Sequence, residues 1–209
     1  MSEPDMTNEA QQSESGPQDP GALTRDSLEW MAFEALMREY TSLKSEQERR
    51  IGFRDNLLYV TMVAVGAVFA FNASTENYSH SLLVIPWITL ILGWTYLVND
   101  RHISLLGQYF REEMTVRFRK RFPGMLEEVF EWEPFHRSDP GREFRKSGQL
   151  VVDLITFCLP SFVSLLVYTQ VSSSFNPWLM ALAIVEGVMS LALAITIFWY
   201  ADFHGSRKS

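Results

Sequence analysis

The stretch "RRIGFRDNLLYVTMVAVGAVFAFNAS", Arg49–Ser74, decides the fold of this chain. Three arginines crowd its start, and no charged residue occurs in positions 56–75. A helix that crosses a bilayer needs roughly 20 mostly apolar residues. The surface helix of a soluble bundle would instead carry a polar face, which this run lacks. The stretch therefore predicts a membrane-spanning helix with a basic anchor at one end.

Three more apolar stretches follow the first one, which covers residues 56–73. They are residues 82–98, 150–169 and 178–200. Two short polar links, "STENYSHS" and "QVSSSFNP", join the four stretches in pairs. The sequence therefore predicts an all-α polytopic membrane protein. Its four transmembrane helices would form two hairpins, 56–98 and 150–200, with amphipathic helices outside the bilayer.

The basic residues indicate how the chain is threaded. If it crosses four times, all 18 lysines and arginines fall on the same side as the termini, and neither short link contains one. Loops rich in lysine and arginine stay in the cytoplasm. We therefore expect cytoplasmic N- and C-termini, external links, and location in a bacterial inner membrane. Tyr78, Trp178 and Trp199–Tyr200 stand where interfacial aromatic residues are usual.

The remaining segments are predicted to lie in the cytoplasm. Residues 1–26 form an acidic tail with too little apolar surface to fold. Residues 27–55 have helical apolar spacing and are expected to continue directly into the first span. Residues 99–149 hold amphipathic helices, among them "MLEEVFEWE", and residues 201–209 form a short tail. We expect 27–55 and 99–149 to be the surfaces for a cytoplasmic protein or a ligand.

The composition argues against several functional classes. A net charge of −7 is unlike that of a nucleic-acid-binding protein, which presents a basic face. Cys158 is the single cysteine, so an intramolecular disulfide cannot form. The four histidines have no metal-ligand spacing, and no phosphate-binding loop or nucleophile elbow is present. The expectation is a non-enzymatic protein without a metal or cofactor.

Glu186 is the most unusual residue, because it lies near the middle of the fourth apolar stretch. An ionised carboxylate at the centre of a spanning helix costs about 2.5–3.5 kcal/mol on insertion scales. Two interpretations remain open: a pore-lining or proton-carrying group, or an acid hydrogen-bonded to a neighbouring helix. Asp153 begins the third span and is a second candidate. It could instead anchor the helix end by pairing with Lys146 or Arg145.

Small residues mark two helix faces on which another helix could approach closely. On the first span the face holds Gly66, Ala70 and Ala73, and the sequence leaves open whether its partner is the same chain or another copy. Glu186 is expected near the edge of the face on the fourth span, and so to face protein. That face consists of Ala183, Gly187, Ser190 and Ala194.

Two prolines stand inside predicted spans. Pro86 is in the second and Pro160 in the third. Proline removes a helix hydrogen bond and can kink the helix. Both are hinge candidates, although membrane helices also tolerate proline without any such role.

Two stretches resemble a group of bacterial integral membrane proteins of uncharacterised function, often from actinobacteria. They are "ERRIGFRDNLLYVTMVAVGAVFAF" and "ILGWTYLVNDRHISLLGQYFREEM", and the likeness covers about residues 38–118. It carries no known active residues. The order of a cytosolic helix before a membrane hairpin is similar to the effector domains of bacterial nucleotide-signalling defence systems, which are thought to form pores.

Three functional hypotheses follow. The leading one is a self-associating, non-enzymatic membrane protein, with pore-forming or regulated effector activity as its most specific form. The second is a small transporter or ion channel with Glu186 in its path. The third is a structural or interaction subunit of a larger membrane complex.

Overall fold

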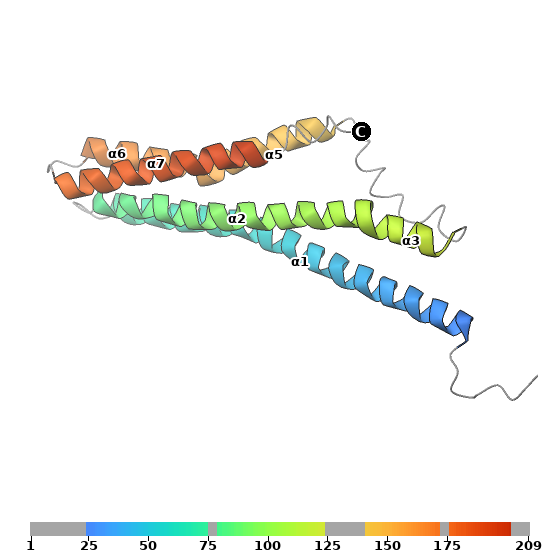
Figure 1. The fold of residues 1–209 in the computed structure, drawn as a ribbon. Helices are drawn as coiled ribbons and strands as arrows, with labels where there is room; N and C mark the ends of the chain where they lie inside the picture. Colours follow the sequence, from blue (N-terminus) through green and yellow to red (C-terminus); the bar gives the residue numbers. More distant parts are fainter. Residues whose placement is uncertain (1–23, 75–78, 124–140, 172–175, 202–209) are drawn as a thin grey trace, which may run out of the picture. The chain divides into compact units, whose positions relative to one another are not determined.

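A computed structural model of the chain describes residues 24–74, 79–123, 141–171 and 176–201 (Figure 1). Every regular element within these ranges is helical, which confirms the predicted all-α class. The elements are α1 (Arg25–Ser74), the 3₁₀ helix η1 (Ser79–Leu83), α2 (Val84–Tyr109), the π-helical turn η2 (Phe110–Met114), α3 (Thr115–Arg121), α5 (Arg142–Phe157), α6 (Leu159–Val171) and α7 (Pro177–Tyr200).

Four helical stretches are long and apolar enough to cross a membrane, as judged by length and composition. They are Arg25–Ser74, Ser79–Arg121, Phe144–Val171 and Pro177–Tyr200. The chain is therefore a multi-pass membrane protein, as its sequence predicts. The acidic tail up to residue 23, the "MLEEVFEWE" segment, Tyr78 and the last eight residues lie outside the described ranges.

The chain divides into two compact units, residues 1–41 and residues 42–209. In the first unit, Thr24 caps the start of α1: its Oγ1 accepts a hydrogen bond from the backbone N–H of Ser27 at 3.3 Å. Such a cap satisfies one of the free N–H groups at a helix start. From there α1 runs without a break to Ser74. This confirms the prediction that the amphipathic helix continues into the first span.

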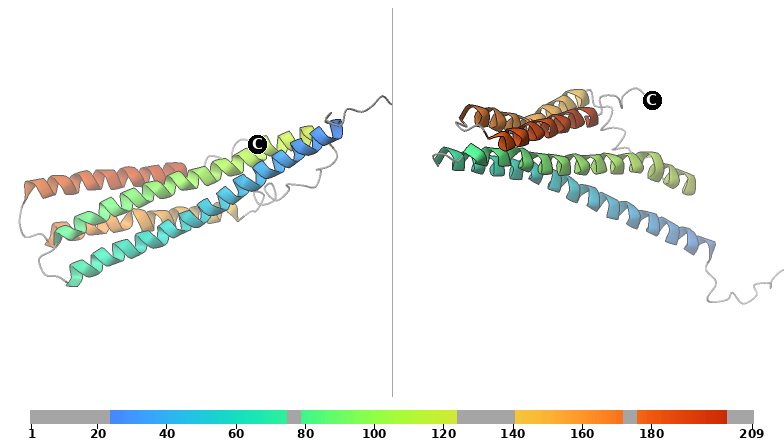
Figure 2. Two further views of the ribbon diagram at one scale, coloured as in Figure 1. Left: turned by 90° about the horizontal axis from the view of Figure 1, so that it is seen from below. Right: turned by 60° about the vertical axis from the view of Figure 1, so that its left-hand side comes forward.

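In the second unit, α2 is the central helix; it runs antiparallel to α1 and to the α5–α6 segment, and parallel to α7 (Figures 1 and 2). The apolar core has two clusters. One surrounds Tyr96, Phe157 and Leu193. The other surrounds Ile85 and Tyr168. The two clusters together fasten the α5–α6 segment and α7 to one side of α2.

Gly93 lies at a close crossing of α2, α5 and α7. A Cβ atom placed on Gly93 would lie 2.9 Å from Leu193 Cδ2 and 3.2 Å from both Cβ and Cδ1 of Phe157. Real Cβ atoms essentially never approach another atom as closely as the first of these distances. Small residues at such crossings let membrane helices pack backbone to backbone. Gly93 therefore fixes the junction of α2, α5 and α7.

The spanning part of α1 is held more loosely. Its buried residues are Leu57, Thr61 and Val65, four positions apart along one narrow face. Its firmer ties to α2 are polar and lie at one end. The Asn99 amide donates to the backbone carbonyl of Arg50 at 2.7 Å, and Arg54 Nη1 donates to Asp100 Oδ1 at 3.0 Å. We call this end of the bundle the basic end.

The two prolines have different structural positions. Pro86 is the third residue of α2, where a backbone N–H has no partner within the helix, so it marks a helix start. Pro86 therefore removes no interior hydrogen bond of α2, and a hinge at this position stays a prediction. Pro160 does accompany a break, since α5 ends at Phe157 and α6 begins at Leu159.

The second spanning helix does not end at residue 98, where the predicted span stops and the segment 99–149 begins. The helix passes from α2 through η2 into α3 and ends at Arg121. The π-helical turn widens the hydrogen-bond pattern, and the Thr115 hydroxyl donates to the carbonyl of Phe110 at 2.7 Å. Single π-turns inside α-helices often mark functional positions.

The outer faces of the spanning helices carry large apolar side chains. Val63 is 72% exposed on α1, and Val188 is 63% exposed on α7. Trp178 and Trp199, at opposite ends of α7, are 83% and 82% exposed. Apolar side chains on such faces suit contact with lipid, and tryptophans at both helix ends suit the two membrane interfaces.

Candidate functional site within the helix bundle

Glu186 lies on the inner face of α7 with only 2% of its surface exposed. Its Oε1 accepts a hydrogen bond from Trp87 Nε1 on α2 at 2.7 Å. The sequence predicted that Glu186 faces protein, and its burial confirms this. The sequence did not identify Trp87 as the partner. Helical periodicity alone does not reveal which residue of another span lies opposite a given position.

The second carboxyl oxygen of Glu186 is buried, and no described group bonds it. A buried polar atom without a partner costs free energy, and in native proteins it calls for a specific explanation. Glu186 therefore has one oxygen engaged in holding α2 and α7 together and one oxygen open for chemistry.

The small residues predicted on the fourth span line the same inner face as Glu186. Ala183 and Ser190 are buried, and Gly187 and Ala194 are half-buried. A Cβ atom on Gly187 would make an ordinary contact of 3.7 Å with Leu165 Cδ1 on α6. This face of α7 is therefore covered from within the chain. Gly66, Ala70 and Ala73 on α1 are all exposed.

Buried hydroxyl groups also occur in the spanning part of the bundle. The hydroxyls of Thr89 on α2 and Ser161 on α6 share a short hydrogen bond. The Ser164 hydroxyl donates to the carbonyl of Ser161 at 2.9 Å. Ser190 on α7 is 2% exposed. The sequence analysis named Ser190 but missed Thr89 and Ser161, because single hydroxyl residues are common in membrane helices.

An apolar layer separates these hydroxyls from the basic end. Phe157 is fully buried, Leu193 is 3% exposed, and both pack around Gly93. The Tyr96 ring lies with its centroid 5.0 Å from that of Phe157. The described bundle is therefore closed at this level by aliphatic and aromatic side chains.

Asp153 lies below this layer, on α5, with 8% of its surface exposed. Gln149 Nε2 donates to Asp153 Oδ1 and to the Tyr96 hydroxyl, at 2.8 Å in each case. The carboxylate thus belongs to a hydrogen-bonded group that joins α5 to α2. The sequence had suggested a helix-end anchor, but Asp153 lies inside the bundle.

The site residues therefore form two separate groups. Glu186 and the small-residue face of α7 lie in the spanning part, and Asp153 lies at the basic end with Tyr96 and Gln149. Within the described ranges, no three His, Cys, Asp or Glu side chains gather in a way that could hold a metal ion.

No protein-family model, curated protein or solved structure gives a significant match to this chain. The resemblance to actinobacterial membrane proteins therefore stays a prediction.

Proposed function

We propose that the chain is a non-enzymatic membrane protein that works as a self-associated assembly in a bacterial inner membrane. The pore-forming or regulated effector is the most specific form of this proposal. One observation carries it: the buried residues of the first span are Leu57, Thr61 and Val65, whereas Gly66, Ala70 and Ala73 lie on its exposed surface. Small residues on an exposed helix face allow a second helix to approach closely.

The position of α1 supports this proposal in a second way. Its hydrogen bonds and ion pairs to α2 keep it attached at the basic end. Its helical start, in the first unit, carries exposed apolar side chains at Trp30 and Met31. Association through α1 would align several copies of this extension side by side. A cytoplasmic partner could then act on all copies together.

Cysteine cross-linking in membranes tests the association. Cys158 is buried and is the only cysteine, so a Cys158→Ala background leaves no competing thiol. Ala73→Cys places a thiol on the small-residue face, and Phe71→Cys places one about 160° away around the helix. We expect a cross-linked dimer from Ala73→Cys alone, and its loss when Gly66→Leu is added. Equal cross-linking from both positions would contradict association through this face.

Thiol labelling in the same background tests the orientation. Ser74 ends α1 at the first link, and Arg119 is exposed on α3 beyond the second span. With external links, a membrane-impermeant maleimide should label Ser74→Cys on intact cells. Arg119→Cys should react only after the membrane is opened. The reverse pattern would invert the proposed topology.

A second candidate function is transport or conduction with Glu186 in the path. Three features favour it: the second carboxyl oxygen of Glu186, which bonds no described group, the buried hydroxyls of Thr89 and Ser161, and the helix break before Pro160. Broken helices beside buried charges occur at the substrate sites of transporters. Passage would require the layer around Phe157 and Leu193 to open. In this case Glu186 would bind a proton or a cation.

Flux measurements in liposomes distinguish the two functions. Under the transport proposal, Glu186→Gln should abolish the ion flux or change its ion selectivity, because charge determines selectivity in a narrow path. The variant should still fold. Glu113→Gln is the matched control, since Glu113 is an exposed carboxylate on η2, outside the spanning part of the bundle. A flux that is unchanged in Glu186→Gln would rule out a conducting role for this carboxyl.

A further inference from the structure

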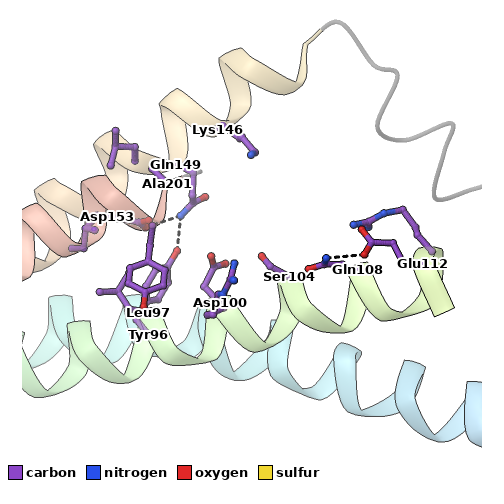
Figure 3. Close-up of a pocket in the computed structure, with 15 residues that line it drawn as sticks. Tyr96, Leu97, Asp100, Ser104, Gln108, Glu112, Lys146, Gln149, Asp153 and Ala201 are labelled. Atoms are coloured by element: carbon purple, nitrogen blue, oxygen red, sulfur yellow. Dashed lines mark hydrogen bonds between the residues drawn. The ribbon is translucent and has the colours of Figure 1, made fainter. Parts of the chain in front are cut away.

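A cleft of about 540 Å³ opens at the basic end of the bundle (Figure 3). Its lower wall is one face of α2 and η2, and its upper wall comes from α5 and the end of α7. The volume lies in the range of roughly 300–1,000 Å³ found for small-molecule sites. The Tyr96–Gln149–Asp153 group closes its inner end, and Figure 3 shows Lys146 directed into it from α5.

The residues lining the cleft change in character along its length. At the inner end, Leu97, Leu150 and Ile197 provide apolar contact. Tyr200, the last residue of α7, and Ala201 after it also line the cleft, so the fourth span ends at this level. The depth is therefore that of the boundary between the hydrocarbon layer and the lipid head groups.

Beyond the apolar end the cleft is lined by charges of both signs. The acidic residues are Asp100, Glu112 and Asp153, and the basic residues are Arg101, Arg111 and Lys146. A pocket for an anionic lipid would be predominantly basic. Equal numbers of acidic and basic side chains favour a ligand that carries one charge of each sign.

The order of the charges along α2 suits one such ligand. Asp153 is already bonded to Gln149, and Asp100 is paired with Arg54 at 3.0 Å. Further out, Ser104 lies opposite Lys146 (Figure 3), and Glu112 follows, where it accepts a hydrogen bond from Gln108 Nε2 at 2.8 Å. Arg101 also lines the cleft.

Side chains on a helix tilt toward its N-terminus, which brings the Glu112 carboxylate back to the level of Gln108. Ser104 and Gln108 are one turn apart, about 6 Å along the axis. A phosphate beside Lys146 and Ser104 could thus reach Glu112 with an amine on a two-carbon linker. Along the cleft, an apolar wall is followed by a basic group and then by an acidic group. A lipid with an amine in its head group has the matching order of acyl chain, phosphate and amine.

We propose that this cleft binds the head group of a zwitterionic phospholipid with a primary amine, of the phosphatidylethanolamine type. Lys146 and Arg101 contact the phosphate, and Glu112 accepts hydrogen bonds from the ammonium group. The acyl chains pass the apolar end toward the bilayer. This site does not depend on the proposed self-association, because all its residues lie outside α1.

Native mass spectrometry of the full-length protein, with lipid added to detergent, tests the proposal. We expect about tenfold higher occupancy by phosphatidylethanolamine than by phosphatidylcholine, whose quaternary amine cannot donate hydrogen bonds. Phosphatidylglycerol, which is anionic, should bind no better than phosphatidylcholine. Equal occupancy by all three lipids, or a preference for phosphatidylglycerol, would overturn the proposal.

Exposed charges provide matched variants. Glu112→Lys should remove the preference for phosphatidylethanolamine and favour phosphatidylglycerol, whereas Glu113→Lys on the next residue, which does not line the cleft, should leave it unchanged. Lys146→Glu should lower occupancy by phosphatidylethanolamine, with Arg119→Glu as its control. Identical effects of Glu112→Lys and Glu113→Lys would contradict a specific site. Competition by free phosphoethanolamine as effective as that by the lipid would exclude a membrane lipid as the ligand.

Discussion

The first and fourth spans have the same kind of sequence and opposite surroundings. Each is a long apolar helix with small residues along one face. In α7 that face is covered, and the buried residues run from Ala183 to Ile197. In α1 the small residues are exposed, and burial is confined to the narrow face of Leu57, Thr61 and Val65.

The difference teaches that a small-residue face permits close approach without choosing a partner. The partner of α7 is set by complementary features of other helices. Gly93 on α2 lets Leu193 approach, and Trp87 donates to Glu186. Nothing comparable meets Gly66, since a Cβ atom added there would have no atom within 4 Å. In the described chain, the face of α1 is therefore open.

The largest expected difference in stability is between the variants Gly93→Leu and Gly66→Leu. Gly93→Leu must displace Leu193 and Phe157, and overpacking of this kind commonly costs about 1–3 kcal/mol and at times more. Gly66→Leu meets open space and should leave monomer stability within about 0.5 kcal/mol. Thermal unfolding of the two variants, each prepared as a detergent-solubilised monomer, measures both.

A larger loss of stability in Gly66→Leu than in Gly93→Leu would contradict the structure. A strongly destabilising Gly66→Leu would show that α1 packs more tightly than its three buried residues indicate. Gly93→Ala is the milder variant for the case in which Gly93→Leu does not fold. It requires Leu193 Cδ2 to shift and Phe157 to give by a few tenths of an ångström, so its effect on stability should be smaller than that of Gly93→Leu.

The sequence predicted the spans well because hydrophobic length is a local property of the chain. It also placed Glu186 toward protein correctly, since the small residues near it mark one helix face. It could not identify Trp87 as the partner, or Gly93 as a close crossing. Those depend on which spans are neighbours and at what height they meet. The position of Pro86 in the first turn of α2 was missed for a related reason, since the hydropathy of 82–98 does not show that the helix begins at Val84.

Hydroxyl groups sharpen the comparison at a smaller scale. Thr89 on α2 and Thr61 on α1 are both buried, at 1% and 0% exposure. Thr89 bonds across to Ser161, whereas Thr61 donates only to Leu57 of its own helix, at 2.7 Å. Hydrogen bonds between membrane helices contribute about 0.6 kcal/mol on average and up to about 1.7.

Thr89→Val should therefore lower the free energy of unfolding by about 0.6–1.7 kcal/mol. Thr61→Val removes no bond between helices and should change stability by less than about 0.5 kcal/mol. Steric trapping or denaturant unfolding in the same detergent compares the two. Equal losses would mean that the bond between Thr89 and Ser161 adds nothing to the association of α2 with α6.

A smaller effect than that of Thr89→Val is expected at Glu186, although its carboxyl is the most unusual group in the spanning part of the chain. Glu186→Leu removes a carboxyl that bonds between α7 and α2. The structure limits the resulting loss of stability, because one oxygen bonds Trp87 and the other bonds no described group. Inserting a carboxyl into the membrane costs free energy in the assembled bundle and also in the separated, inserted helices. This cost therefore cancels from the difference between the two states, which is the stability of the bundle.

What remains is one hydrogen bond, about 0.6 kcal/mol on average, partly offset by the apolar contacts that leucine gains. The free energy of unfolding of Glu186→Leu should therefore lie within about 1 kcal/mol of the wild-type value. That of Glu186→Gln, which keeps an acceptor for Trp87, should lie closer still. Unfolding of both variants, beside Trp87→Phe as the partner deletion, measures this. A loss in Glu186→Leu well beyond that of Trp87→Phe would show that the second oxygen also holds the bundle together. A stable Glu186→Leu protein that has lost its activity would instead assign this carboxyl to function, because nothing in packing would require it.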